Sequence, residues 1–185
     1  MGVSMLKKLK YHWTIGELVT IGVFAAAAKV ITMVVALAGG GMNPVTLLIK
    51  NLIFTTFFIV MLYKVKKSGT MILFTFVSML ISLLLMGAEA STALGMFLAS
   101  FIGEIFIFVS GGASKKYAAV IGVAAFDFSY RVLSLFIAYL VMRETPEIVY
   151  MVIPIIAIGY IGAVIGIFTG IKAVKELRYA GIVRS

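Results

Sequence analysis

The sequence predicts an all-α protein, an integral membrane bundle of six transmembrane helices in a single domain, residues 1–185. Three observations predict it: the composition, six apolar stretches, and the placement of basic residues. Hydrophobic residues make up 63% of the 185 residues and charged residues 12%, against about 45–50% and about 25% in soluble domains. A soluble domain of this size cannot hide so much apolar surface from water. The composition therefore excludes a water-soluble enzyme and a disordered chain, and the lack of cysteine excludes a disulfide scaffold.

Six apolar stretches are long enough to cross a hydrocarbon core about 30 Å thick. The first begins after a short basic leader and is too long for the apolar region of a signal peptide, so it is expected to be an uncleaved first helix. The expected spans are residues 14–37, 44–63, 69–86, 90–110, 117–142 and 149–174.

The breaks between the spans carry turn-forming or charged residues. Residues 39–44 (GGGMNP) form a glycine-rich turn, and Pro44 is suited to start the second helix. Residues 64–68 form a short basic loop between the second and third spans, and residues 110–116 a flexible one between the fourth and fifth. Only residues 87–90 separate the third span from the fourth. No stretch is long or polar enough to form an inserted soluble domain.

The basic residues orient the bundle in the membrane. Of the 16 Lys and Arg residues, 12 fall on one side of a six-span arrangement, whereas Arg143 alone falls on the other and three lie within spans. Basic loops stay in the cytoplasm, so both termini are expected there, and the chain is expected to be a multi-pass membrane protein. The net charge of +9 is then a topology signal and implies no nucleic acid partner. The 12 residues are Lys7, Lys8, Lys10, Lys64, Lys66, Lys67, Lys115, Lys116, Lys172, Lys175, Arg178 and Arg184.

The motifs that carry common catalytic chemistry are missing. The sequence contains no phosphate-binding GxxxxGK[ST] loop, no GxSxG nucleophile turn and no HExxH zinc motif. The single histidine, His12, lies in the leader, and Asp127 is the single aspartate. We therefore expect no enzymatic activity, no metal site and no cofactor.

Five ionisable residues lie within the spans: Lys29, Lys50, Glu104, Asp127 and Arg131. Each costs about 2.5–3.5 kcal/mol at the centre of an inserted helix. They must therefore pair with one another, reach an aqueous cavity, or both. Asp127 and Arg131 are four residues apart and share a helix face, so they can pair with each other.

The depth of these charges predicts a substrate pocket in the outer half of the membrane. Lys29 and Lys50 lie about 12 Å and 9 Å below the outer face, and Arg131 lies about 16 Å below it. Lys29, Lys50, Asp127 and Arg131 are expected to line the pocket, with two tyrosines as further wall residues, Tyr130 and Tyr160. Three cations against one carboxylate favour an anionic ligand.

A competing arrangement stays open, in which the intramembrane charges only neutralise one another. Glu89 and Glu104 would then turn inward and pair with Lys29 and Lys50, fixing helix packing without binding a ligand. Mutation of the cations would lower stability in this arrangement, because it would leave a buried carboxylate unpaired.

Small residues recur at four-residue spacing in three spans. Such stripes let helix backbones approach closely in lipid, either within the bundle or against another membrane protein. Internal packing is the favoured explanation for the fourth span. The stripes are Gly22 and Ala26 in the first span, Gly95, Ala99 and Gly103 in the fourth, and Gly162, Gly166 and Gly170 in the sixth.

Three segments match a known pattern: residues 18–26 (LVTIGVFAA) after the leader, the basic loop at residues 64–69 (KVKKSG), and the ending at residues 175–182 (KELRYAGI). In these segments the chain resembles the substrate-binding S components of energy-coupling factor (ECF) transporters, and within them the Trep_Strep-type branch. The six-span organisation, with cytoplasmic ends and no ATPase motif, extends the resemblance over nearly the whole chain.

The resemblance implies that the chain lies in a prokaryotic plasma membrane, captures a vitamin or related micronutrient from outside and delivers it through a T component driven by two ATPase subunits. It also implies a docking surface for the T component on the first helix, of the type Ala-x-x-x-Ala. The nearest match here is Gly22-x-x-x-Ala26 with Ala25 adjacent, and Lys29 stands where a strict pairing with Ala25 would need alanine. A self-contained secondary transporter or channel, and an assembly factor without substrate, remain alternatives. The sequence leaves the substrate open.

Overall fold

The computed structural model describes residues 13–41, 43–86, 90–141 and 146–181. All the regular structure in these ranges is helical, as the sequence predicts. The six helices are α2 (Ile15–Ala38), α3 (Pro44–Lys64), α4 (Thr70–Met86), α5 (Ala90–Val109), α6 (Lys116–Val141) and α7 (Pro146–Tyr179).

Within the described residues, four helices are long and apolar enough to cross a membrane: α2, α3, and segments Tyr117–Ile137 of α6 and Ile153–Tyr179 of α7. The apolar segments described in the other two helices are shorter, Thr70–Leu84 in α4 and Leu94–Val109 in α5. With 17 residues, α4 is about 26 Å long, slightly less than a typical hydrocarbon core. The six helices agree in number with the six predicted spans, and four of them meet the length criterion for a full crossing within the described residues.

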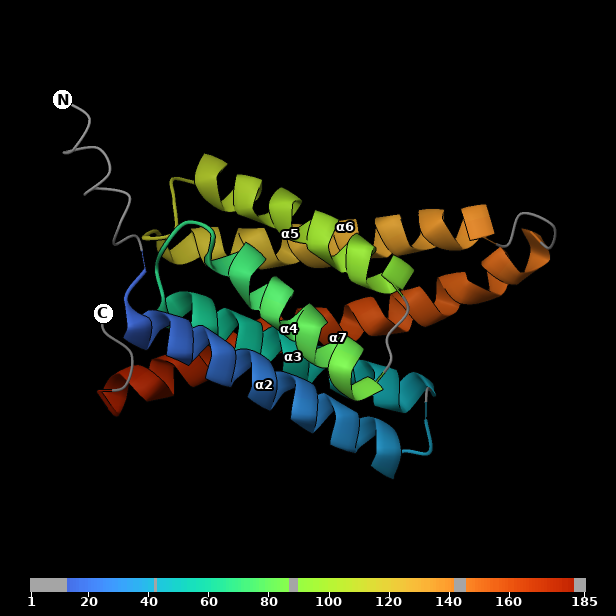
Figure 1. The fold of residues 1–185 in the computed structure, drawn as a ribbon, viewed down its shortest axis with the longest axis horizontal. Helices are drawn as coiled ribbons and strands as arrows, with labels where there is room; N and C mark the ends of the chain where they lie inside the picture. Colours follow the sequence, from blue (N-terminus) through green and yellow to red (C-terminus); the bar gives the residue numbers. More distant parts are fainter. Residues whose placement is uncertain (1–12, 42, 87–89, 142–145, 182–185) are drawn as a thin grey trace.

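The helices pack side by side in one bundle, with α3 and α7 in the most extensive contact and α2 resting on α3 and α4. α2 begins and α7 ends at the same end of the bundle, next to the loops from α3 to α4 and from α5 to α6 (Figure 1). The basic loops that were expected to share one membrane face therefore share one end of the bundle. We call this the basic end. Its cytoplasmic placement stays a prediction, and the leader, Met42, Glu89, Arg143 and Arg184 lie outside the described residues.

Phenylalanines of three helices meet in the hydrophobic core, among buried aliphatic side chains. Phe58 of α3 stacks on Phe74 of α4 with ring centroids 4.7 Å apart, and meets Phe126 of α6 edge-on at 5.1 Å. All three side chains are buried. Outside this core, large apolar side chains are exposed over much of the surface, for example Ile15, Leu84 and Phe108. So much exposed apolar surface suits contact with lipid and not with water.

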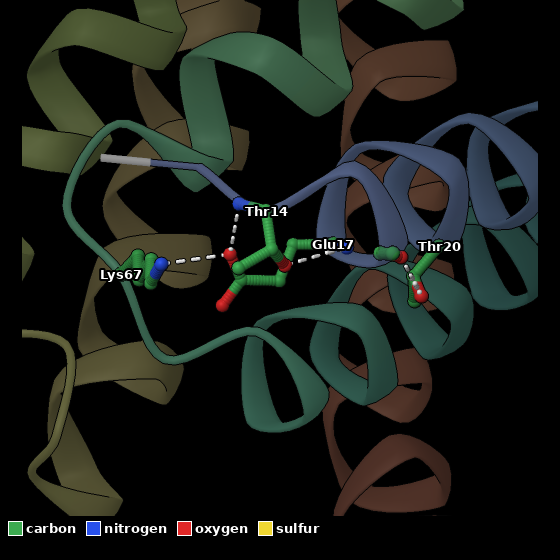
Figure 2. Close-up of polar contacts among 5 residues, drawn as sticks. Thr14, Glu17, Thr20 and Lys67 are labelled. Carbon is green, nitrogen blue, oxygen red and sulfur yellow. Dashed lines mark hydrogen bonds and ion pairs between the residues drawn. The ribbon is translucent and has the colours of Figure 1, made fainter. Parts of the chain in front are cut away.

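Local capping fixes the start of the first helix at the basic end. The Thr14 amide donates to Glu17 Oε2 at 2.8 Å, and the Glu17 amide donates to Thr14 Oγ1 at 3.3 Å, a reciprocal capping box (Figure 2). Lys67, from the loop after α3, forms an ion pair with the same Glu17 carboxylate at 2.7 Å. This contact ties the start of α2 to the α3–α4 loop.

Candidate functional site

A cavity of about 210 Å³ lies among α2, α3, α5 and α6. Five of the six residues predicted to bind substrate line it: Lys29, Lys50, Asp127, Tyr130 and Arg131. They come from three helices, and the structure brings them together in one place. The remaining lining residues are Thr32, Leu47, Asn51, Phe54, Met96 and Phe126.

Asp127 and Arg131 form a closed pair in the wall of this cavity. Arg131 donates from Nε to Asp127 Oδ2 at 2.7 Å and from Nη2 to Asp127 Oδ1 at 3.0 Å. Both side chains are about nine-tenths buried, and the two parallel bonds match the planar fork of the guanidinium. The pairing expected from their four-residue spacing is therefore present, and each of these charges compensates the other.

Helix α7 holds the same arginine from the opposite side. Arg131 Nη1 donates to the Ile156 carbonyl at 3.1 Å. A Cβ atom at Gly159 would lie only 2.5 Å from Arg131 Nη1, so this glycine leaves the space that the guanidinium occupies. Tyr160 does not line the cavity: its ring lies against the guanidinium, 5.8 Å from Arg131 Cζ. The structure therefore places Tyr160 next to a lining residue and not among the residues that line the cavity.

The two lysines carry the remaining charge of the cavity. Lys29 Nζ lies 5.2 Å from the centre of the Phe54 ring, a cation–π contact. Neither Lys29 nor Lys50 forms an ion pair with a carboxylate among the described residues. With Asp127 and Arg131 balanced, the lining carries a net charge of +2.

Glu104 does not neutralise these lysines. Its carboxylate accepts hydrogen bonds from the backbone amides of Gly69 and Met71, at the start of α4. A carboxylate at a helix N-terminus satisfies amides that lack an intrahelical partner and is favoured by the helix dipole. The competing arrangement, in which Glu104 pairs with Lys29 or Lys50, is therefore wrong for Glu104. Its other proposed partner, Glu89, lies outside the described residues.

Two polar lining residues were missed in the sequence. Asn51 donates from Nδ2 to the Leu47 carbonyl at 2.8 Å, and Thr32 donates to the Lys29 carbonyl at 3.0 Å. The chain has only two asparagines, and Asn51 is the one placed within a span, directly after Lys50. A side-chain amide next to an intramembrane lysine was the sequence signal that could have identified Asn51.

Among the described residues, no three His, Cys, Asp or Glu side chains lie close enough together to hold a metal ion.

The glycine stripe of the sixth span packs inside the bundle. A Cβ at Gly162 would lie 2.4 Å from the Leu48 carbonyl oxygen, and one at Gly166 would lie 2.7 Å from the Leu52 carbonyl oxygen. Backbone-to-backbone packing of α7 against α3 leaves no space there for a side chain. Of the two explanations given for this stripe, internal packing holds and docking of a second protein does not.

The stripe of the fourth span also packs internally. Ala99 is fully buried, and a Cβ at Gly103 would lie 2.9 Å from both the Gly122 carbonyl oxygen and Phe126 Cβ, on α6. The favoured explanation for this span therefore agrees with the structure.

The stripe of the first span differs from the other two. A Cβ at Gly22 would meet nothing within 4 Å, and Ala26 is only half-buried. Ala25, by contrast, is fully buried in the core. Gly22 and Ala26 therefore lie at the edge of the outward face of α2, together with exposed Val19 and Val23, whereas Ala25 belongs to the face that packs on the bundle and is not available for docking.

Comparison with known proteins places the chain in a family. No curated protein and no solved structure matches it. The profile of a family described as hypothetical bacterial integral membrane protein (Trep_Strep) matches residues 15–150, which cover α2 to α6 and the start of α7. The match spans well over half of the chain and includes every residue that lines the cavity. The chain therefore belongs to the Trep_Strep family of bacterial integral membrane proteins.

Proposed function

We propose that this protein is the substrate-binding S component of an ECF-type importer, and that it captures a small anionic solute such as a vitamin or related micronutrient. The observation that carries the proposal is the cavity among α2, α3, α5 and α6, whose charged lining residues give it a net charge of +2. Membership of a bacterial integral membrane family and the resemblance of residues 18–26, 64–69 and 175–182 to S components support the class.

The lining favours an anion for a simple electrostatic reason. Lys29 and Lys50 act as point charges, and their attraction for an anion grows as the effective dielectric constant falls. The Asp127–Arg131 pair contributes hydrogen-bonded rigidity and no net charge. A volume of about 210 Å³ is that of about seven water molecules, so a compact solute suits the cavity in this conformation.

Binding measurements on the purified chain test the pocket. Lys29→Met and Lys50→Met are each expected to weaken the binding of a small carboxylate or phosphate ligand by at least about tenfold, because one charge-assisted contact contributes about 1.5–3 kcal/mol. Lys64→Met is the matched control, since it makes the same change on α3 at an exposed position outside the cavity. Equal affinity in all three variants would contradict the pocket, as would tighter binding of a cationic analogue.

The docking partner of an S component is a T component, and the outward face of α2 is proposed to receive it. Gly22 and Ala26 offer a site of close backbone approach on that face. Gly22→Leu is expected to abolish transport while retaining substrate binding, because no neighbour within the bundle meets a side chain there. Loss of folding or of binding in this variant would show that the stripe packs internally.

A second experiment separates an importer subunit from a self-contained carrier. An S component is expected to copurify with a T component and two ATPase subunits, and to depend on ATP hydrolysis for uptake. Uptake driven by an ion or proton gradient in liposomes that contain this chain alone would overturn the proposal in favour of a secondary transporter.

A further inference from the structure

A second hollow lies at the basic end, far along the helices from the substrate cavity. It has a volume of about 520 Å³ and lies between α6 and α7, with Tyr63 of α3 contributing to its wall. Most of its lining is aliphatic or aromatic, and its two cations, Lys175 and Arg178, lie in the last turns of α7. We call it the α6–α7 groove; its lining residues are Tyr63, Tyr117, Val120, Ile171, Val174, Lys175, Arg178 and Tyr179.

A smaller cavity of about 170 Å³ adjoins the groove, and both are lined by Tyr63 and Arg178. Its other lining residues include Lys66 from the α3–α4 loop and Lys115 from the α5–α6 loop. Cations from three separate segments therefore converge at the end of an apolar groove. Ser114 and Ala119 place the small cavity beside the first turn of α6, where unpaired backbone amides also favour an anion.

Arg178 lies where the two hollows meet. Its guanidinium carbon is 5.6 Å from the centre of the Tyr63 ring. Its Nε atom is buried and has no hydrogen-bond partner in the described part of the chain. A buried donor without an acceptor is destabilising, so an acceptor from outside the chain would satisfy it.

We propose that the groove and the small cavity together bind one anionic phospholipid. The phosphate accepts hydrogen bonds from Arg178, with Lys66, Lys115 and Lys175 adding positive charge around it. One acyl chain lies along the apolar lining between Tyr179 and Ile171, a length of about 12 Å along α7. A soluble phosphate would use the cations but would leave the apolar lining uncovered, so the lipid accounts for both parts of the site.

The exposed tyrosines agree with this placement. Tyr117 is 76% exposed and Tyr179 is 77% exposed, and both lie at the rim of the groove. Tyrosine is enriched at membrane–water interfaces, where lipid headgroups lie. A role for Arg178 solely in balancing the dipole at the end of α7 accounts for its charge, but it explains neither the buried Nε nor the cations from two loops.

Native mass spectrometry of the detergent-purified chain tests the site. Phosphatidylglycerol is expected to remain bound at about tenfold lower concentration than phosphatidylcholine with the same acyl chains. Arg178→Gln and Lys115→Gln are each expected to reduce this preference at least about threefold. The matched control is Lys172→Gln, which removes the same charge from an exposed position of α7 that lines neither hollow.

Two further arms separate a lipid from a soluble anion. Val120→Trp fills the groove and is expected to weaken phosphatidylglycerol binding about tenfold, whereas Ile121→Trp, an exposed neighbour outside the lining, is expected to leave it unchanged. Glycerol 3-phosphate, which has the phosphate without acyl chains, is expected not to displace the lipid at equal concentration. Displacement by glycerol 3-phosphate, or equal lipid binding in Arg178→Gln, Lys115→Gln and Lys172→Gln, would overturn the proposal.

Discussion

The close packing of α7 on α3 predicts that one added methyl group destabilises the bundle. Gly162 faces α3 so closely that a Cβ would lie 2.4 Å from the Leu48 carbonyl oxygen and 3.0 Å from Leu48 Cα. Both atoms belong to the backbone of a helix, so they cannot rotate aside as a side chain would. The change Gly162→Ala therefore requires the two helices to separate.

The size of the effect follows from this geometry. Real Cβ contacts shorter than 3.0 Å are essentially never seen, so the helices must move apart by at least about 0.6 Å at this point. Overpacking of this kind costs about 1–3 kcal/mol. Alanine also gains up to about 1 kcal/mol of helix propensity over glycine. Gly22→Ala receives the same gain without a clash, because a Cβ there meets nothing within 4 Å.

The assay is reversible unfolding of the purified chain in mixed micelles, followed by far-ultraviolet circular dichroism. Gly162→Ala is expected to have a free energy of unfolding about 1–3 kcal/mol below that of Gly22→Ala. Comparing the two variants removes the propensity term, because both change glycine to alanine within a helix. Equal stability of the two variants would refute the backbone-to-backbone packing of α7 on α3.

Three other predictions concern the charges and the topology. Asp127→Asn leaves the buried Arg131 charge uncompensated, so it is expected to lower the free energy of unfolding by about 3–5 kcal/mol in the same assay. Glu17→Gln breaks the ion pair between Glu17 and Lys67. Their side chains are 27% and 31% exposed, so the change is expected to lower the free energy of unfolding by no more than about 1 kcal/mol. A cysteine at Ser114, in the α5–α6 loop at the basic end, is expected not to react with a membrane-impermeant thiol reagent added to intact cells. A cysteine in the α2–α3 loop is expected to react with it. The reverse pattern would invert the proposed orientation.

The helix boundaries show what hydropathy can and cannot predict. The second span was expected to begin at Pro44, and α3 does so, because proline suits the first position of a helix. The sixth span was expected over residues 149–174, whereas α7 runs from Pro146 to Tyr179. Its last turns contain Lys175, Glu176 and Arg178, which end an apolar stretch but are good helix formers. Hydropathy locates the part of a helix that crosses the membrane, and the helix itself extends further.

The contacts of the candidate site likewise include some that the sequence predicts and some that it does not. The Asp127–Arg131 pair was predictable because both residues lie on one helix, four positions apart. The supporting contacts of Gly159 and Tyr160 with Arg131 were not predictable, because they depend on α7 packing beside α6. The position of Glu104 at the start of α4 likewise depends on how α5 packs on α4. Sequence alone identifies intramembrane charges, but which of them meet depends on tertiary packing.

The sign of one stability change decides between a binding cavity and a set of internal ion pairs. A lysine without a counterion costs about 2.5–3.5 kcal/mol at the centre of a membrane helix. In the ligand-free protein, Lys29→Met and Lys50→Met are therefore expected to raise the free energy of unfolding, by an amount reduced by any water that reaches the cavity. Internal pairing predicts the opposite, because removing a lysine would leave its carboxylate buried and unpaired. If the two variants are more stable than the unmodified protein and bind anions less tightly, the lysines are there to bind a ligand. If the variants are less stable, the binding cavity is refuted.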